Sequence, residues 1–216
     1  MSDPDMPRVE TSFQLNEARV HLDGLLREVR ARWVDEDEDI SIAIGLGHVL
    51  EHLNCAWHYR AKSVEEVSAE SQEEFEAQCC LVPHLTSGLN LIEGQDVEGQ
   101  GVHVTPTKVR WWYRPWTWWA HAPGNPVMIA ELEKAQLALK KLRSQVAAIN
   151  LDDRVLAAGL AEAYGHLNLA WHLRRKSSAQ VASLATSTRE MLASSIPRTI
   201  GTLDFRLAEA KAGSLE

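Results

Sequence analysis

The sequence predicts an all-α protein made of an internally duplicated helical bundle. The segment His-Leu-Asn-x-Ala-Trp-His-x-Arg-x-Lys-Ser occurs at residues 52–63 and again at 166–177. Nine of its twelve positions are identical when each residue is aligned with the one 114 positions later. Around both copies, apolar residues recur at helical spacing. Together these features predict two pseudo-symmetric three-helix units with a Trp-rich segment between them.

The match between the two halves continues outside this segment. Upstream, Gly45-Leu46 aligns with Gly159-Leu160 in the same register. Downstream, Val67, Pro83 and Leu89 align with Val181, Pro197 and Leu203. The duplication therefore covers much more of each half than the motif itself.

Three helices are expected in the first unit, at residues 13–33, 40–62 and 63–83. Leu15, Ala18, Leu22 and Leu25 give the first of them one apolar face. An acidic turn at 35–39 precedes the second, where carboxylates suit a helix N-terminus. Ser63 and Glu66 form a capping-box pattern that opens the third.

The second unit repeats this order, with helices expected at 127–149, 152–176 and 178–195. We divide the chain into a disordered N-terminus (1–12), a first repeat (13–93), a Trp-rich linker (94–126) and a second repeat (127–212). The two repeats are expected to pack as one globular domain.

Composition excludes several classes of protein. The 216 residues carry a net charge of −8, whereas a nucleic-acid binder needs a basic face. The same charge disfavours docking on anionic membranes, and no apolar run is long enough for a membrane span. Three cysteines, Cys55, Cys79 and Cys80, make no disulfide framework. We expect a soluble, cytoplasmic protein with reduced thiols.

The second helix of each unit carries polar groups among apolar ones. Asn54 and His58 are four residues apart, as are Asn168 and His172, so each pair can meet on one helix face. We expect each asparagine to fix the tautomer of its histidine and to hold the helix in register. The two central helices are expected to meet at the pseudo-dyad.

A metal site is the alternative use of these helices. His48 and His52 are spaced to bind one ion, and Glu162 and His166 occupy the same positions in the second copy. A set of histidines and a carboxylate in a helical bundle suits Fe, Mn or Zn. The candidate ligands are His48, His52, His58, Glu162, His166 and His172.

Two further features favour binding. Arg60 and Arg174 follow Trp57 and Trp171 by three residues, which fits a cation–π stack or an anion clamp. Five tryptophans crowd the linker, where they either fill a gap in the core or form a partner-binding surface. They are Trp111, Trp112, Trp116, Trp118 and Trp119.

No phosphate-binding glycine loop, nucleophile elbow or Cys-x-x-Cys pair is present. We therefore expect a non-catalytic module that binds another protein or forms a homo-oligomer. The alternative is a helical protein, enzyme or not, that depends on Fe, Mn or Zn or binds a small ligand between its two central helices.

Overall fold

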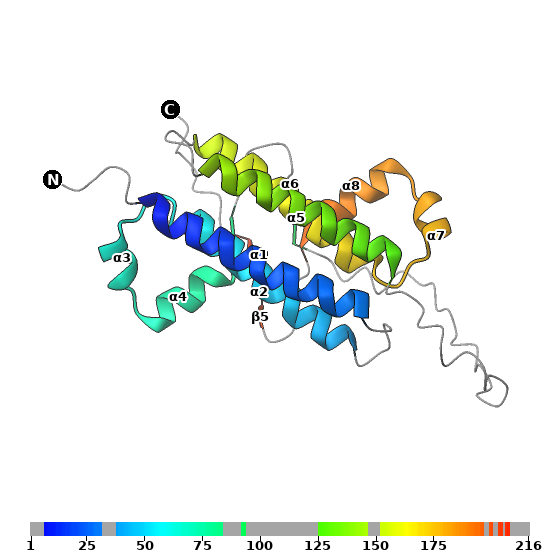
Figure 1. Ribbon diagram of the computed structural model, residues 1–216, viewed down its shortest axis with the longest axis horizontal. Coiled ribbons are helices and arrows are strands. Elements are labelled where there is room, and N and C mark those ends of the chain that lie inside the picture. Colours follow the sequence, from blue (N-terminus) through cyan, green and yellow to red (C-terminus); the bar gives the residue numbers. More distant parts are fainter. Residues whose placement is uncertain are drawn as a thin grey trace.

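Two pairs of long helices dominate the computed structural model (Figure 1). It describes residues 7–31, 38–83, 92–93, 125–146, 152–196, 199–200, 203–204 and 206–207. The first pair is α1 (Pro7–Ala31) and α2 (Glu38–His58), and the second is α5 (Pro126–Val146) and α6 (Asp153–Leu173). Most of the described residues are helical, so the all-α expectation is confirmed at this level.

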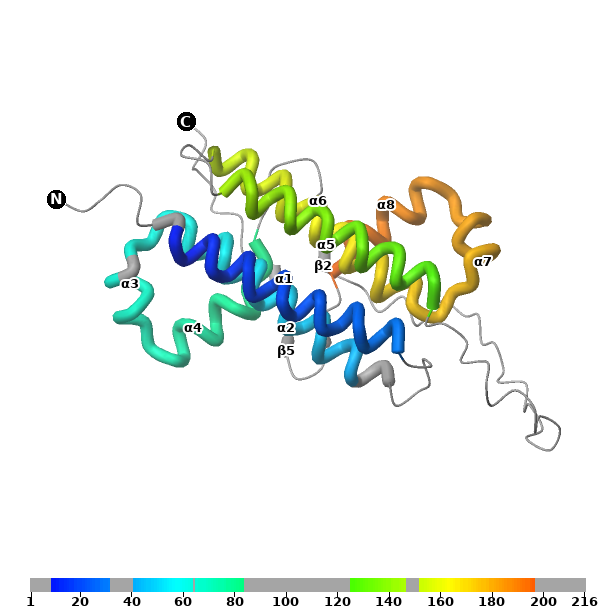
Figure 2. The backbone as a smooth tube through the Cα atoms, viewed as in Figure 1, coloured from blue at the N-terminus to red at the C-terminus, as the bar shows by residue number. Residues whose placement is uncertain are grey.

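Two short helices follow each long pair. They are α3 (Val64–Ser68) and α4 (Gln72–Cys79) after the first pair, and α7 (Ser178–Ala182) and α8 (Thr186–Ser194) after the second. In Figure 2 each set arches away from the long helices and returns to them.

The two pairs meet mainly through α1 and α5, which run in opposite directions. Near one end, Arg30 Nη2 lies 2.6 Å from Glu133 Oε1. Near the other, Arg143 Nη1 donates to Asn16 Oδ1 over 3.0 Å. On the far side of the bundle, α2 and α6 meet less extensively. The main junction is therefore made by the first helix of each pair, whereas the sequence indicated the second.

Short strands tie the ends of the two halves together. Strand β1 (Leu81–Val82) pairs in parallel with β6 (Arg206–Leu207), and β2 (Ile92–Glu93) with β3 (Ser195–Ile196). An antiparallel pair, β4 (Thr199–Ile200) with β5 (Leu203–Asp204), completes them. Each has only two residues, too few to leave an alternating pattern in the sequence.

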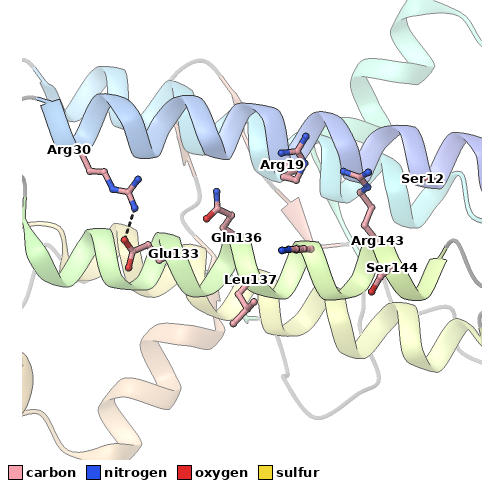
Figure 3. Close-up of a pocket in the computed structure, with 9 residues that line it drawn as sticks. Ser12, Arg19, Arg30, Glu133, Gln136, Leu137, Arg143 and Ser144 are labelled. Carbon is pink, nitrogen blue, oxygen red and sulfur yellow. Dashed lines mark hydrogen bonds and ion pairs between the residues drawn. The ribbon is translucent and has the colours of Figure 1, made fainter.

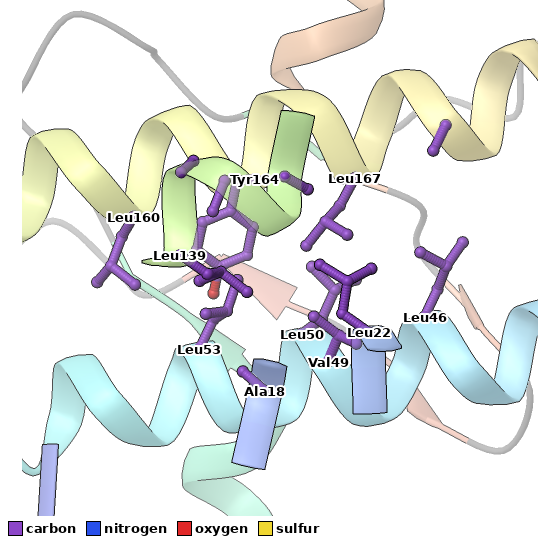
Figure 4. Close-up of a cluster of buried hydrophobic side chains, with 14 of the residues drawn as sticks. Ala18, Leu22, Leu46, Val49, Leu50, Leu53, Leu139, Leu160, Tyr164 and Leu167 are labelled. Carbon is purple, nitrogen blue, oxygen red and sulfur yellow. The ribbon is translucent and has the colours of Figure 1, made fainter. Parts of the chain in front are cut away.

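One apolar core runs through all four long helices (Figure 4). Leu22 from α1, Leu50 and Leu53 from α2, Leu139 from α5 and Leu167 from α6 are at most 1% exposed. Leu22 belongs to the apolar face that the helical spacing predicted for the first helix. Burial of these faces supplies most of the stability of such a bundle, because helix propensity alone is weak.

The expected third helix of each unit is wrong in one respect, because it is two helices. Ser71 accepts a hydrogen bond from the Glu74 backbone and starts α4 with a second capping box. Just before it, the carboxylate of Glu70 turns inward to Tyr59 and Lys62. The second unit breaks in the same place, between α7 and α8.

Helix ends differ from expectation by a few residues. Helix α1 begins at Pro7, inside the stretch predicted to be disordered, and proline suits a first helical turn because its missing N–H is not needed there. Helix α2 ends at His58, after which the chain turns. The Trp-rich residues 111–119 lie outside the described residues.

Candidate functional site

The polar residues that recur in α2 and α6 bind backbone carbonyls after the short helices. Asn54 Nδ2 donates to the carbonyl of Cys79, and Asn168 Nδ2 donates to that of Ala193 over 2.7 Å. His58 Nε2 lies 2.8 Å from the Leu81 carbonyl, and His172 Nε2 lies 2.9 Å from that of Ser195. The donors and the acceptors of the second half both lie 114 positions after those of the first.

These contacts correct the expected role of the Asn–His pairs. Since a carbonyl only accepts, Nε2 of His58 and of His172 must carry the proton. The carbonyl therefore fixes the tautomer, and the asparagine does not. Burial lowers the pKa of both imidazoles, although the carbonyl hydrogen bond opposes this. Neutral imidazoles with Nε2 occupied are anchors for the short helices.

Arg60 and Arg174 stack on their tryptophans. The guanidinium carbon lies 3.9 Å from the Trp57 ring centroid in the first case and 3.7 Å from that of Trp171 in the second. Each arginine also donates to the carbonyl of the same tryptophan, over 2.8 Å and 2.9 Å. Arg60 additionally pairs with Asp153 of α6 at 3.0 Å. Of the two alternatives for these arginines, the structure shows the cation–π stack, placed at the C-terminal end of each helix.

Of the predicted metal ligands, His52 and His166 bond to side chains of the preceding long helix. His52 Nδ1 lies 2.7 Å from Gln14 Oε1, and His166 Nδ1 lies 2.8 Å from Glu131 Oε2. Glu131 is 3% exposed, so burial by itself would raise its pKa. The contacts from His166 and Lys134 outweigh burial, and the net pKa is lowered. Glu131 is a buried carboxylate with partners.

Three imidazoles gather on the first helix pair. The His21 ring centroid lies 5.1 Å from that of His48 and 5.0 Å from that of His52. Burial, followed by the neighbouring His21, lowers the pKa of His52 to about 4. Sequence reasoning missed His21, because its facing of α2 depends on how the two helices are rotated against each other, which spacing along one helix does not show.

The six predicted ligands do not form one site. His48 and Glu162 are exposed, and Glu162 has Lys141 at 3.4 Å. His58 and His172 are occupied by carbonyls on separate short-helix segments. Within the part of the chain that the structure describes, no three His, Cys, Asp or Glu side chains are placed to hold a metal ion.

An open trough lies between α1 and α5 (Figure 3). The volume of the trough is about 880 Å³. Its walls are Ser12, Arg19 and Arg30 on α1 and Glu133, Gln136, Leu137, Lys140, Arg143 and Ser144 on α5. Four of these nine residues are cationic and one is anionic, on a chain whose net charge is −8. The trough is therefore a basic strip on an acidic protein.

Known proteins give no assignment for this geometry. No protein-family model, curated protein or solved structure matches the chain. None of the described helices combines the length and apolar character that crossing a membrane requires. The predicted tryptophans Trp111, Trp112, Trp116, Trp118 and Trp119 lie outside the described residues.

Proposed function

We propose that the chain is an internally duplicated, non-catalytic helical module that binds an acidic segment of a partner protein along the α1–α5 trough. The duplication is supported by the contacts that recur 114 residues apart. On the first helices the matching interval is 117, because Leu25 faces Gly45 as Leu142 faces Gly159. By the same interval Gln14 matches Glu131, which explains why both meet a histidine.

The trough has the dimensions of a helix-binding surface. From Ser12 to Arg30 it follows α1 for roughly 27 Å at 1.5 Å per residue. That length suits an extended or helical peptide better than a compact small molecule. Leu137 lies midway along the length of the trough, at its outer edge on α5, with 67% of its surface exposed, where an apolar anchor of the partner could cover it. Figure 3 shows its side chain on the side of α5 away from α1.

An exposed apolar stripe borders the trough on α1. Val9, Phe13 and Val20 are 58%, 53% and 44% exposed, and their spacing places them on one side of the helix. On a helical wheel this side lies roughly 60–120° from Ser12 and Arg19. A partner that fills the trough would reach the stripe as well. Exposed aromatic and aliphatic side chains beside arginines are typical of binding surfaces.

The charges of the trough favour an acidic partner. Arg19 and Arg30 are paired with Asp23 and Glu133, at 2.7 Å and 2.6 Å. Within the described residues, Lys140 and Arg143 have no carboxylate partner. Two such faces from two copies of the chain would bring like charges together, which disfavours a symmetric dimer through this surface. An amphipathic helix with carboxylates beside leucines complements it.

Binding of designed peptides to the full chain tests this proposal. The probe is a fluorescein-labelled helical peptide with leucine on one face and glutamate on the other, and its lysine counterpart is the control. Fluorescence anisotropy should show the acidic peptide binding at least about tenfold more tightly, a difference of 1.4 kcal/mol. Added salt should weaken it, because the charged rim of the trough is exposed.

Two matched pairs of variants locate the binding. Lys140→Glu and Leu137→Ser change the trough, whereas Lys141→Glu and Met191→Ser change exposed residues that do not line it, the first at the cost of the ion pair with Glu162. Only the first pair should weaken the acidic peptide by about tenfold or more. Equal binding of both peptides, or equal effects of both pairs, would contradict the proposal. So would a dimer in light scattering that Leu137→Ser dissociates, because the occupant would then be a second copy.

A divalent-metal protein is the second candidate, and the cluster of His21, His48 and His52 favours it. The described side chains are not placed to hold an ion as they stand, so these imidazoles, with ring centroids about 5 Å apart on adjacent helices, would have to rotate to share one, and Nδ1 of His52 is already in contact with Gln14. His48 is exposed, so an ion could reach it from solvent. Titration calorimetry with Zn²⁺ should show one site that His21→Ala removes and His166→Gln leaves intact. Equal heats for both variants would exclude the cluster as that site.

A further inference from the structure

Two buried thiols meet between α2 and α4. Cys55 and Cys79 are 0% and 2% exposed, and their Sγ atoms are 2.9 Å apart. A disulfide has an S–S distance of about 2.05 Å, so the sulfurs need approach by only roughly 0.9 Å. Tyr59 packs beside them, with Phe75 against the same cluster.

Neighbouring contacts hold this pair in place. Asn54, the residue before Cys55, donates a hydrogen bond from its side-chain amide to the backbone carbonyl of Cys79. His58, on the next turn of α2, contacts the carbonyl of Leu81. Hydrogen bonds thus hold α2 beside Cys55 against the backbone at and after Cys79. The two sulfurs face each other in the fold as it stands.

The second unit contains no sulfur at the corresponding positions. Cys55 matches Leu169 and Cys79 matches Ala193 in the 114-residue register. Leu169 is buried, and Ala193 packs against the same cluster. An aliphatic pair therefore suffices for packing at this place, and the thiols add a chemistry that packing does not need.

From this arrangement we infer that Cys55 and Cys79 form a reversible redox pair, which a hydroperoxide oxidises to a disulfide between α2 and α4. With hydrogen peroxide, one thiolate attacks an oxygen, the O–O bond breaks, and a sulfenic acid and hydroxide form; an organic hydroperoxide releases an alkoxide instead. The second thiol then displaces the sulfenic oxygen as water and closes the S–S bond. The two sulfurs lose two electrons and the peroxide gains them. A dithiol reductant reverses the reaction.

The bond would fasten the arch of α3 and α4 to α2. It would close a loop between residues 24 positions apart, which restricts the unfolded chain and resists opening of the arch. The hydrogen bond to Cys55 and burial raise the pKa of the Cys79 thiol. Oxidation should therefore be slower than at an exposed cysteine and should accelerate as the pH rises.

Peptide mapping of the full chain tests this inference directly. The protein, purified with reductant and freed of it, is treated with hydrogen peroxide and digested without reduction. We expect a mass lower by two hydrogens, a peptide that links Cys55 to Cys79, and a higher melting temperature that dithiothreitol reverses. Linkage of Cys79 to Cys80, a disulfide between chains, or irreversible oxidation that leaves Cys55 as a thiol would overturn it.

Variants that copy the second unit provide the controls. Cys55→Leu with Cys79→Ala installs the residues of the other half, and this protein should lose both the linkage and the peroxide-dependent shift in melting temperature. Cys80→Ser copies Ser194 and keeps the pair, so it should oxidise as the unaltered chain does. A shift that survives in the double variant, or that disappears with Cys80→Ser, would contradict the assignment.

Discussion

Tyr164 donates its hydroxyl hydrogen to the side-chain oxygen of Asn54 and so joins α6 to α2 across the bundle. Burial raises the pKa of Tyr164, which keeps the hydroxyl protonated as a donor. The matching position in the first unit is Leu50, which has no hydroxyl. Among the described residues, the side-chain oxygen of Asn168 accordingly has no hydrogen-bond partner. The two halves therefore differ at their crossing.

Replacing Tyr164 with phenylalanine should destabilise the protein. The ring still fills its place in the core, but the buried oxygen of Asn54 loses its donor. An unsatisfied buried acceptor costs about 1–3 kcal/mol. Urea denaturation followed by circular dichroism measures this loss of unfolding free energy. An unchanged midpoint would show that the hydrogen bond contributes nothing.

The two asparagines should differ in importance. Asn54→Ala removes the bonds to Cys79 and Tyr164, whereas Asn168→Ala removes only the bond to Ala193. Both variants remove the same atoms from a buried side chain, so the difference reflects the contact with Tyr164. We expect Asn54→Ala to cost about 1–2 kcal/mol more in unfolding free energy. Equal losses in parallel denaturation curves would argue against this ranking.

Three glycines within helices should respond differently to alanine. A Cβ on Gly159 would lie 2.6 Å from Leu142 Cδ1, one on Gly45 would lie 3.0 Å from Leu25 Cδ1, and one on Gly24 meets nothing within 4 Å. Gly24→Ala should stabilise by about 0.5–1 kcal/mol through helix propensity. Gly159→Ala should destabilise by about 1–3 kcal/mol. Gly45→Ala should fall between them in thermal melts.

Acidification should destabilise the bundle through His58 and His172. The pKa of each imidazole in the folded state is lowered from 6.5 by burial. Below pH 6.5 the unfolded chain therefore binds more protons than the folded one. Each further drop in pH lowers the unfolding free energy, until the pH reaches the pKa of the folded state. The unfolding free energy should fall with pH in this window.

Glutamine variants isolate that effect. His58→Gln with His172→Gln keeps a donor for the carbonyls of Leu81 and Ser195 but removes both titrations. The pH dependence of the unfolding free energy below 6.5 should then be shallower than in the unaltered chain. A slope as steep as before would assign it to other groups.

The sequence was most informative along single helices and least informative between them. Spacing predicted the long helices and the apolar faces of Leu22 and Leu53, and the capping box at Ser63 is confirmed. It missed the break at Ser71, because serine, glutamate and glutamine also occur within helices. His21 beside His48 depends on helix rotation, a property of tertiary packing.

The contact between the two thiols and the trough could not be predicted from the sequence either. Cys55 and Cys79 are 24 residues apart, and only the return of α4 onto α2 brings them together. The basic strip combines Arg19 and Arg30 from one helix with Lys140 and Arg143 from another. Lys140, Lys141 and Arg143 are close together in the sequence of α5, but only the packing of α1 on α5 brings Arg19 and Arg30 beside them. The internal duplication and the role of the Trp-rich segment stay predictions.

Contacts between distant parts of one chain have a consequence for assembly. Arg30 with Glu133 and Asn54 with Tyr164 join residues 103 and 110 positions apart. Because both helix pairs belong to one molecule, each is held near the other at an effective concentration that dilution cannot lower. The melting temperature of the isolated chain should thus be the same at micromolar and nanomolar concentrations, unlike that of a bundle formed from separate subunits.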